Sequence, residues 1–451
     1  MNRLIQADGM QPQTRLTREQ KEAVGLLSIG TFLEYFDLML YIYMAVILNE
    51  FFFPKYDPHA TQLLSAFAFC TTYLLRPIGA LIFGWIGDTI GRKVTVIITT
   101  FMMAFSCIII ASLPTYTEIG ITAAVVVSIC RIMQGMSSMG EIIGAELYLT
   151  ETIKRPQQYM SVALISFFSV LGGTFALGVA FISSSYNFNW RYAFCFGALV
   201  ALIGSVARTT LRETPEFADA KRRMKMIFAD INENSSILDK NPIWTEKVNK
   251  VTALYLFLIF CTWPVCFYLT FIHCGEILRN NFGYTVEQVI YQNFFVSIVE
   301  MLGNLSLIYL SYYVYPLMIL KIRMVIFWVL ILVCLYLLNH ARTAFDIFLF
   351  QAFIILIVPS LIPAHSILFI YFPVFKRFTY VSFLYAISNT IMYIITSFGL
   401  IYLTKYLGNY GLLIIIIPVM IGYSFGIFHF EKLEKTAGNY PKKKKWFLLM
   451  N

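Results

Sequence analysis

Two carboxylates stand near the middle of the first long apolar stretch of the chain. Glu34 and Asp37 lie three positions apart within residues 23–48, so a helix places both on one face. A carboxylate in hydrocarbon is costly unless it faces a partner or a water-filled path. Such a pair is typical of a pathway for ions or polar solutes, and we predict that either Glu34 or Asp37 takes up and releases a proton.

Two arginines lie at a similar depth in later apolar stretches. Counting about 1.5 Å per residue from the predicted helix ends puts Arg76 and Arg131 near the level of the two acids. Two acids and two bases at one depth can form a buried ion-pair network that only holds the helices together. They can also form a site for substrate and protons, in which a guanidinium binds a carboxylate through a bidentate fork. The two interpretations are compatible.

A polar stripe follows the helix predicted at 119–149. Arg131 and Gln134 recur with Ser138 and Glu141 at the spacing of one helical face. We predict that Arg131 and Gln134 contact substrate. Glycines at 140 and 144 in the same helix indicate close packing against a neighbouring helix.

The second half of the chain carries fewer charges within its apolar stretches. Glu300 lies mid-depth in the eighth predicted helix and Asn389 lies in the eleventh. We predict that both contact substrate, together with Arg76. Asp346 and His365 lie near opposite ends of the tenth predicted helix and are interpreted as interfacial.

The sharpest local motif lies between the second and third predicted helices. It reads Gly84-Trp85-Ile86-Gly87-Asp88-Thr89-Ile90-Gly91-Arg92-Lys93. Gly84 and Gly91 suit a tight turn, and Asp88 and Arg92 are placed to pair with neighbouring helix ends or charges. We predict that these four residues belong to a gate. The alternative is a solvated turn that only supplies positive charge.

Composition indicates an all-α polytopic membrane protein. The chain of 451 residues is 59% hydrophobic and 13% charged, with a mean hydropathy of +0.71. Its apolar runs are continuous over about 20 residues, the length of a bilayer-spanning helix, and do not alternate as barrel strands do. We predict about twelve transmembrane helices, at roughly 23–48, 61–86, 94–113, 119–149, 159–183, 190–208, 251–274, 287–313, 323–338, 344–371, 380–404 and 411–430.

Several functional classes are disfavoured by the same sequence. The net charge of +9 comes from loops spread along the chain and does not indicate nucleic-acid binding. The eight cysteines form no Cys-x-x-Cys and the five histidines are scattered, so we predict neither a metal site nor a cofactor. No spacing of a nucleophile and a base stands out, so an enzyme is not expected.

The basic residues predict the orientation and the domains. They gather in alternate loops at Arg92 and Lys93, Lys154 and Arg155, Lys321 and Arg323, and Lys376 and Arg377. The positive-inside rule then places both termini in the cytoplasm. The longest polar stretch, 208–250, is a cytoplasmic central loop between two six-helix bundles, 1–207 and 251–451, and the second bundle ends in a basic tail. Such a plan is typical of two bundles that rock about a central site.

At these residues the chain resembles the major facilitator superfamily. The turn motif at 84–93 is similar to the family's signature between helices 2 and 3, although Thr89 stands where arginine is usual. Other stretches resemble the metabolite:proton symporter branch, which includes proline/betaine and α-ketoglutarate permeases; they are Phe32 to Asp37, Arg76 to Gly79, Arg131 to Gly135 with Gly140-Glu141, Trp190 to Tyr192 with Arg212 to Phe217, and Phe372-Pro373 with Lys376-Arg377. The resemblance implies alternating access and proton coupling, and it assigns Glu34, Asp37, Arg76, Arg131 and Glu141 to the pathway and gate. Residues 310–316 depart from the family, which often repeats its turn signature there.

We therefore expect a proton-coupled symporter for a small polar metabolite in a bacterial inner membrane. The partners are the solute, protons and the bilayer, and a monomer is expected. Arginines and acids at one depth favour a zwitterion such as proline or betaine, and a dicarboxylate:proton symporter is the alternative. The sequence is also compatible with an uncoupled facilitator, an exporter or a non-transporting membrane sensor.

The first prediction concerns topology. Reporter fusions or cysteine labelling should place both termini and residues 208–250 in the cytoplasm, and residues 49–59 outside, because cations mark the cytoplasmic loops. A central loop found on the outer side would contradict the whole helix count.

Overall fold

The computed structural model describes residues 15–44, 73–186, 189–209, 211–215 and 246–441, with isolated positions at 13, 48, 51, 52, 218, 219, 221 and 222. Three predicted features lie largely or wholly outside these residues. They are the first part of the helix at 61–86, most of the central loop at 208–250 and the four lysines at 442–445.

The described chain is helical along almost its whole length. The first half contains α2 (Arg18–Tyr43), α5 (Arg76–Thr89), α6 (Arg92–Ser112), α7 (Tyr116–Ile119), α8 (Ile121–Thr152), α9 (Gln157–Tyr186) and α10 (Trp190–Arg208). The second half contains α13 (Lys250–Phe260), α14 (Thr262–Phe267), η2 (Tyr268–His273), α15 (Cys274–Phe282), α16 (Val286–Tyr313), α17 (Pro316–Asn339), α18 (Ala344–Ile357), α19 (His365–Phe369), α20 (Val374–Leu407), η3 (Gly408–Gly411) and α21 (Leu412–Thr436). Each of the twelve predicted helices has a counterpart among these elements, which confirms the all-α fold class.

Local capping signals set several helix starts. Thr17, Thr285 and Thr343 each form a capping box with the residue three positions on, which satisfies backbone N–H groups that lack a partner in the first turn. In the third case that residue is Asp346, and its carboxylate accepts hydrogen bonds from the N–H groups of Arg342 and Thr343. Asp346 therefore caps the N-terminal end of α18.

Proline breaks one predicted helix and distorts another. The sequence predicts one helix over 344–371, but in the structure α18 ends at Ile357 and α19 starts only at His365. Pro359 and Pro363 lie in the break, where the missing N–H groups and the restriction on the preceding residue oppose a helix. Pro264 likewise lies in the short α14, which is followed by the π-helical turn η2.

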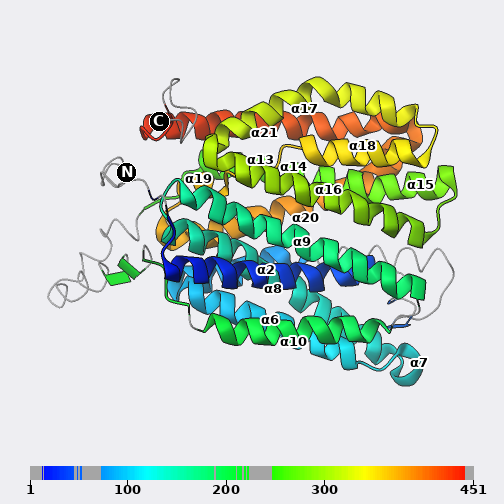
Figure 1. The fold of residues 1–451 in the computed structure, drawn as a ribbon, viewed down its shortest axis with the longest axis horizontal. Coiled ribbons are helices and arrows are strands. Elements are labelled where there is room, and N and C mark those ends of the chain that lie inside the picture. The colour runs from blue at the N-terminus through cyan, green and yellow to red at the C-terminus, as the bar shows by residue number, and fades with distance from the viewer. Residues whose placement is uncertain are drawn as a thin grey trace.

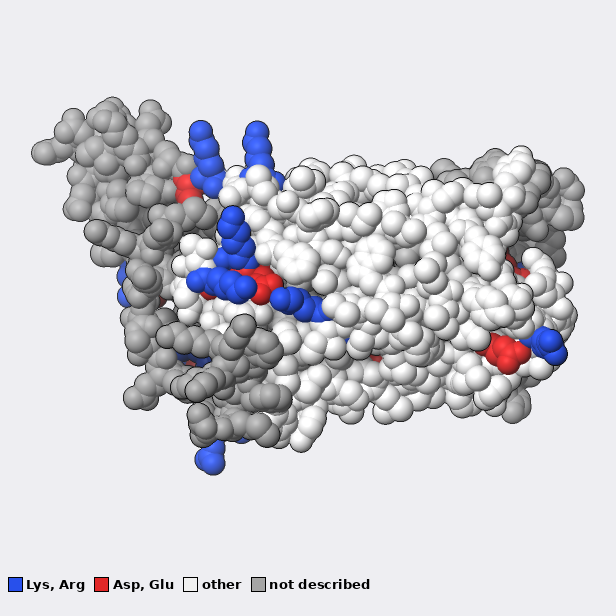
Figure 2. Space-filling view, turned by 90° about the horizontal axis from the view of Figure 1, so that it is seen from above, with Lys and Arg blue, Asp and Glu red and all other residues white. Residues whose placement is uncertain are grey.

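The outer surface of the described chain suits hydrocarbon. Nine of its helices are long and apolar enough to cross a membrane, and large apolar side chains such as Phe105, Val329, Leu332 and Phe425 are more than half exposed. On the face drawn in Figure 2, a broad uncharged band separates the two ends, and the described Lys and Arg side chains gather mainly toward one of them. Exposed apolar residues in such a band are expected to face lipid.

The two halves of the chain meet along two seams. In Figure 1, α17, α18 and α21 lie on one side of the molecule and α6, α8 and α10 on the other, with α9 and α16 side by side between them. The second seam is formed by α5 and α20. Within the first half, α2 packs on α9 and α6 packs on both α8 and α10.

Glycines allow the closest helix contacts, as the small-residue spacing indicated. A Cβ added at Gly140 would meet Thr99 of α6, and one added at Gly84 would lie 2.6 Å from Cα of Thr379 in α20. At Gly172 of α9 an added Cβ would meet the backbone carbonyl oxygen of Phe32 in α2. Backbone atoms cannot move aside as a flexible side chain can, so this contact depends on glycine.

The second prediction tests this contact. Gly172→Ala should push α9 away from α2 and lower the free energy of unfolding by about 1–3 kcal/mol, measured as a lower melting temperature in detergent. The matched control is Gly173→Ala, because an added Cβ there meets only Cγ of Met39 at 3.7 Å. Equal melting temperatures for the two variants would contradict the close approach.

Candidate functional site

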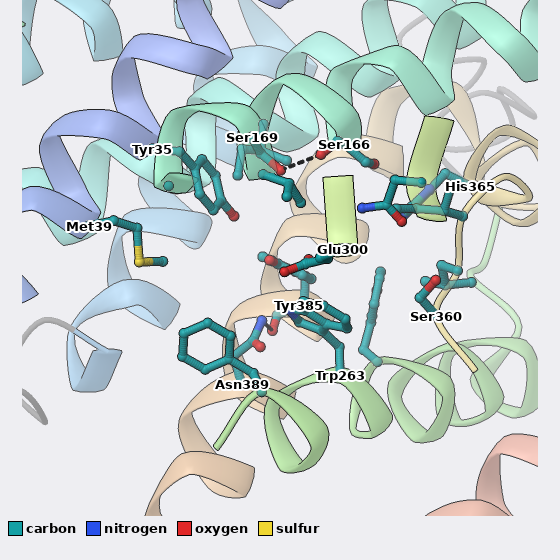
Figure 3. A pocket seen from close by; sticks show the side chains of 18 of the residues that line it. Tyr35, Met39, Ser166, Ser169, Trp263, Glu300, Ser360, His365, Tyr385 and Asn389 are labelled. Atoms are coloured by element: carbon teal, nitrogen blue, oxygen red, sulfur yellow. Dashed lines mark hydrogen bonds between the residues drawn. The ribbon is translucent and has the colours of Figure 1, made fainter. Parts of the chain in front are cut away.

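A cavity of about 150 Å³ lies between the two halves of the molecule. The first half lines it with residues that include Tyr35, Arg76, Glu146 and Ser166, and the second half with residues that include Trp263, Glu300, His365, Tyr385 and Asn389. Figure 3 shows Tyr35, Ser169 and Ser166 along one side of the cavity and Asn389, Tyr385 and Trp263 along the other, with Glu300 between them. A cavity of this size holds one small organic molecule.

Arg76 is the arginine that lines this cavity. It is the first residue of α5, and Pro77 follows it with a backbone suited to the first helical turn. The guanidinium lies over the ring of Tyr73, 4.2 Å from the ring centre, and the residue is 4% exposed. Its Nε and Nη2 are buried and have no hydrogen-bond partner among the described residues. Two adjacent unsatisfied donors of one guanidinium are suited to bind a carboxylate of a solute.

Aromatic rings form much of the remaining wall. Tyr73 and Tyr393 contact each other with ring centres 4.4 Å apart, and Phe260 contacts Tyr385 at 5.2 Å. Trp263 lines the same cavity. Such faces attract a cation through the ring quadrupole, the more so where water is excluded.

Two acids face the cavity from opposite halves. Glu300 comes from α16, as the sequence analysis placed it, whereas Glu146 of α8 was not predicted. Glu146 accepts a hydrogen bond from Ser166 at 3.1 Å and lies 3.9 Å from Nε2 of His365. His365 was interpreted as interfacial, but the break before α19 brings it into the cavity wall. Asn389 also lines the cavity, and its amide donates to the carbonyl of Tyr385.

The other predicted polar residues lie inside the first half, outside the cavity lining. Arg131 donates to Gln134 at 2.8 Å and lies over the ring of Tyr41, and Gln134 donates to Cys107. Asp37 is buried against Gly197, where an added Cβ would meet its carboxylate. Of the four predicted charges, Arg76 lines the cavity and the other three do not, because depth along a helix does not determine which way a side chain faces.

Glu34 and Glu141 share a much smaller void. Its volume is about 10 Å³, and both acids line it together with Thr100. The Thr100 hydroxyl donates to Glu141 at 2.8 Å. This void lies among helices of the first half.

The turn motif joins the two halves at one end of the molecule. Asp88 of α5 accepts hydrogen bonds from the backbone N–H groups of Phe378 and Thr379 in α20, at 3.0 and 2.8 Å. Arg92 pairs with Asp88 at 3.1 Å and with Glu151 of α8 at 3.2 Å. These side chains are almost fully buried, so the network acts with little screening by water.

The network extends beyond the predicted motif. Arg377 at the start of α20 donates to Glu151 at 2.9 Å. Gly91 has φ of 151°, which favours glycine, and the N–H of Arg92 donates to the carboxylate of Glu213. From the sequence, Arg377 is a loop cation within a stretch that resembles the symporter branch, and the helix predicted at 119–149 ends two residues before Glu151.

A second set of contacts joins the two halves at the same end. We call this set and the network around Asp88 and Arg92 the two ties. Glu434 at the end of α21 accepts both terminal nitrogens of Arg155, at 3.0 and 3.2 Å, and the hydroxyl of Tyr371 at 2.7 Å. The hydroxyl of Tyr315 also donates to Glu434. Tyr315 lies in the stretch 310–316, where the family's repeated signature is absent. Tyr315 and Glu434 both belong to the second half, so this stretch positions the acid that binds Arg155 of the first half.

The comparisons with known proteins agree with this architecture. The sequence model of the Major Facilitator Superfamily matches residues 27–364, about three quarters of the chain. The chain belongs to the major facilitator superfamily. Members of this superfamily are membrane transporters, and the membership supports the prediction that the chain is not an enzyme.

Curated relatives of this superfamily member include transporters of small solutes. It is 31% identical over 273 residues to the Inner membrane metabolite transport protein YhjE of Escherichia coli K12, covering 58% of this chain and 59% of that protein. It is 31% identical to the Proline/betaine transporter of the same organism, over 44% of this chain and 41% of the relative. A Putative proline/betaine transporter of Staphylococcus aureus is 33% identical, over 44% and 45%. The matches thus span roughly half the length of these relatives.

Solved structures share the fold. The proton:xylose symporter XylE bound to 6-bromo-6-deoxy-D-glucose superposes with a TM-score of 0.71 at 14% identity, covering 92% of this chain and 95% of the symporter. The human organic anion transporter MFSD10 superposes with a TM-score of 0.64 at 13% identity, covering 92% of this chain and all of that one. These likenesses establish the twelve-helix fold of the superfamily.

The third prediction concerns the two ties. Asp88→Asn and Glu434→Gln should each shift the balance between conformations by about 1–3 kcal/mol toward opening at that end. The measurement is labelling of Ser360→Cys, a cavity position, by a membrane-impermeant thiol reagent applied from the side that carries the ties, in a background without other reactive cysteines.

The control is Glu22→Gln. Glu22 pairs with Arg18 at 3.2 Å, but both side chains are largely exposed, so the pair is worth little. Labelling at Ser360→Cys should rise in the two tie variants and stay at the unsubstituted rate in the control. Equal labelling in all variants would show that the ties do not close the path.

Proposed function

We propose that this protein takes up a small zwitterionic solute, such as proline or betaine, together with protons by alternating access. The observation that carries the proposal is the guanidinium of Arg76, which faces the cavity with two buried donors that have no described partner. A buried donor left unsatisfied is costly, so the arrangement suits a solute that brings a carboxylate.

The charges of the cavity favour a zwitterion over a dicarboxylate. Arg76 offers one positive charge, whereas Glu146 and Glu300 offer two acids. A zwitterion places its carboxylate on Arg76 and its ammonium group near an acid and the aromatic wall. A dicarboxylate brings a second negative charge toward the same acids. Arg131 would be its natural second partner, but it lies outside the lining.

The other residue assignments remain proposals. Arg76, Glu300 and Asn389 are proposed to contact the solute directly, whereas a role for Arg131 and Gln134 would act through neighbours. The residues Gly84, Asp88, Gly91, Arg92 and Glu141 are proposed for the gate. Glu34 and Asp37 are the acids that the sequence predicts for proton coupling, and neither lines the cavity.

Relatives and fold support the function and the location. Proline/betaine and metabolite transporters are relatives at about 31% identity, and a proton:xylose symporter shares the fold. We propose a bacterial inner membrane, both termini in the cytoplasm and a monomer. The two ties then lie at the cytoplasmic end and close the cavity from that side.

The fourth prediction tests the substrate class. In proteoliposomes with an imposed proton gradient, uptake of labelled proline should be inhibited by betaine and not by α-ketoglutarate or citrate. Arg76→Lys should weaken proline binding roughly tenfold to a hundredfold, because losing the fork costs about 1.5–3 kcal/mol while the charge stays. Arg279→Lys is the control, since Arg279 is exposed at the end of α15.

Each result that contradicts this prediction would favour a different function. Inhibition by α-ketoglutarate or citrate, with indifference to betaine and proline, would make the dicarboxylate symporter the better description. Concentrative uptake that survives collapse of the proton gradient would contradict coupling. Binding without any flux would favour a sensor.

A further inference from the structure

Glu146 and His365 meet across the seam between the two halves of the molecule. Glu146 lies on α8 and His365 is the first residue of α19, and the carboxylate Oε1 is 3.9 Å from the imidazole Nε2. Both side chains line the cavity. They therefore border the solute's path and belong to halves that must move relative to each other during alternating access.

The pair is buried and only partly satisfied. Glu146 is 2% exposed and its carboxylate accepts a hydrogen bond from Ser166, which holds it toward the cavity. Nδ1 of His365 is buried without a hydrogen-bond partner among the described residues. The imidazole ring contacts Phe369 one turn on in the same short helix. The Glu146–His365 pair therefore differs from the two ties at the end of the molecule, because each carboxylate of the ties accepts hydrogen bonds from several donors.

A break in the helical structure precedes His365. Residues 358–364 are not helical, so α19 is separated from α18 by a break that itself lines the cavity at 359–362. Discontinuous helices beside a central site are a recurring way to place coupling groups in transporters. Because His365 belongs to the second half and Glu146 to the first, the distance between them changes when the halves move relative to each other.

Other titratable groups also face this cavity. They are Tyr35 and Tyr43 from α2, Tyr73 and Arg76 around the start of α5, Glu300 from α16, and Tyr385 and Tyr393 from α20. None of the ion pairs recorded among the described residues joins Glu146 to a lysine or arginine. His365 is the basic group that the structure places within 4.0 Å of it.

We propose that the Glu146–His365 pair carries the coupled proton, an inference that rests on the proposed proton-coupled function. The imidazole keeps a proton on Nδ1 throughout, and the coupled proton is a further one. On Oε1 it gives a neutral acid beside a neutral imidazole, and on Nε2 it gives a carboxylate–imidazolium ion pair; both forms have no net charge. When the proton leaves, the pair carries one negative charge in a site of low dielectric. The protonated pair therefore favours the conformation in which the seam is closed and excludes water. The deprotonated pair favours the conformation in which the seam is open to water. Proton binding from one side and release to the other thereby bias the two conformations.

The transport test uses the whole protein in proteoliposomes with labelled proline. Glu146→Gln and His365→Asn should each abolish concentrative uptake driven by a proton gradient, while exchange of internal for external proline falls less. The double variant should be no worse than either single variant, because both remove one shared proton site. Glu287→Gln removes an exposed acid from the start of α16 and serves as the control.

Two comparator variants separate this assignment from the acids predicted from the sequence. Asp37→Asn and Glu34→Gln remove carboxylates that do not line the cavity. Full accumulation in Glu146→Gln and His365→Asn, with loss in Asp37→Asn or Glu34→Gln, would overturn the proposal. The reverse pattern supports it.

A second measurement needs no substrate and keeps the two proposals distinguishable. Infrared spectra of the purified protein, titrated with acid, should contain a proton-linked carboxyl or imidazole band that both Glu146→Gln and His365→Asn remove and Glu287→Gln retains. A set of bands unchanged in both variants would overturn the pair as a proton site. Failure of the unsubstituted protein to carry proline or betaine would instead contradict the proposed function while this band is still present.

Discussion

Hydrocarbon offers no partner to a charge, so an ionised side chain within the spanning helices must find one in the protein or in a polar cavity. Two groups of the described charges follow this rule. Asp88, Arg92 and Glu151 satisfy one another at the end of the molecule. Arg76 and Glu300 instead line the central cavity. Charges of the first kind hold the helices in one arrangement, whereas those of the second kind are available to a solute.

The two ties are reciprocal. Asp88 is an acid of the first half that accepts backbone N–H groups from the second, and Glu434 is an acid of the second half that accepts a guanidinium from the first. The first half therefore supplies Asp88 and Glu151 to these contacts and the second half supplies Glu434, although residues 310–316 lack the repeated signature. Tyr315 within that stretch donates to Glu434. That stretch thus supports the acid of the second tie from within the second half.

The break at 358–364 links packing to chemistry. Prolines that oppose a helix there end α18 early and start a new helix at His365. An unbroken helix over 344–371 would carry His365 toward the end of the spanning segment. The break brings it to the cavity wall, opposite Glu146 of the other half. A backbone feature thus creates a polar contact across the seam in which the two halves move.

The sequence by itself determined the class, the helices and the depth of the charges, because continuous apolar runs and loop cations follow directly from the bilayer. It also located Arg76, Glu300 and Asn389, which line the cavity. It could not tell them from Arg131 or Asp37, which lie at a similar depth. Side-chain direction around a helix axis depends on which neighbours pack against it, and several helices here are apolar on all sides. Glu146, His365 and Glu434 acquired their partners only through contacts between residues far apart in the chain, so only the tertiary structure decided them.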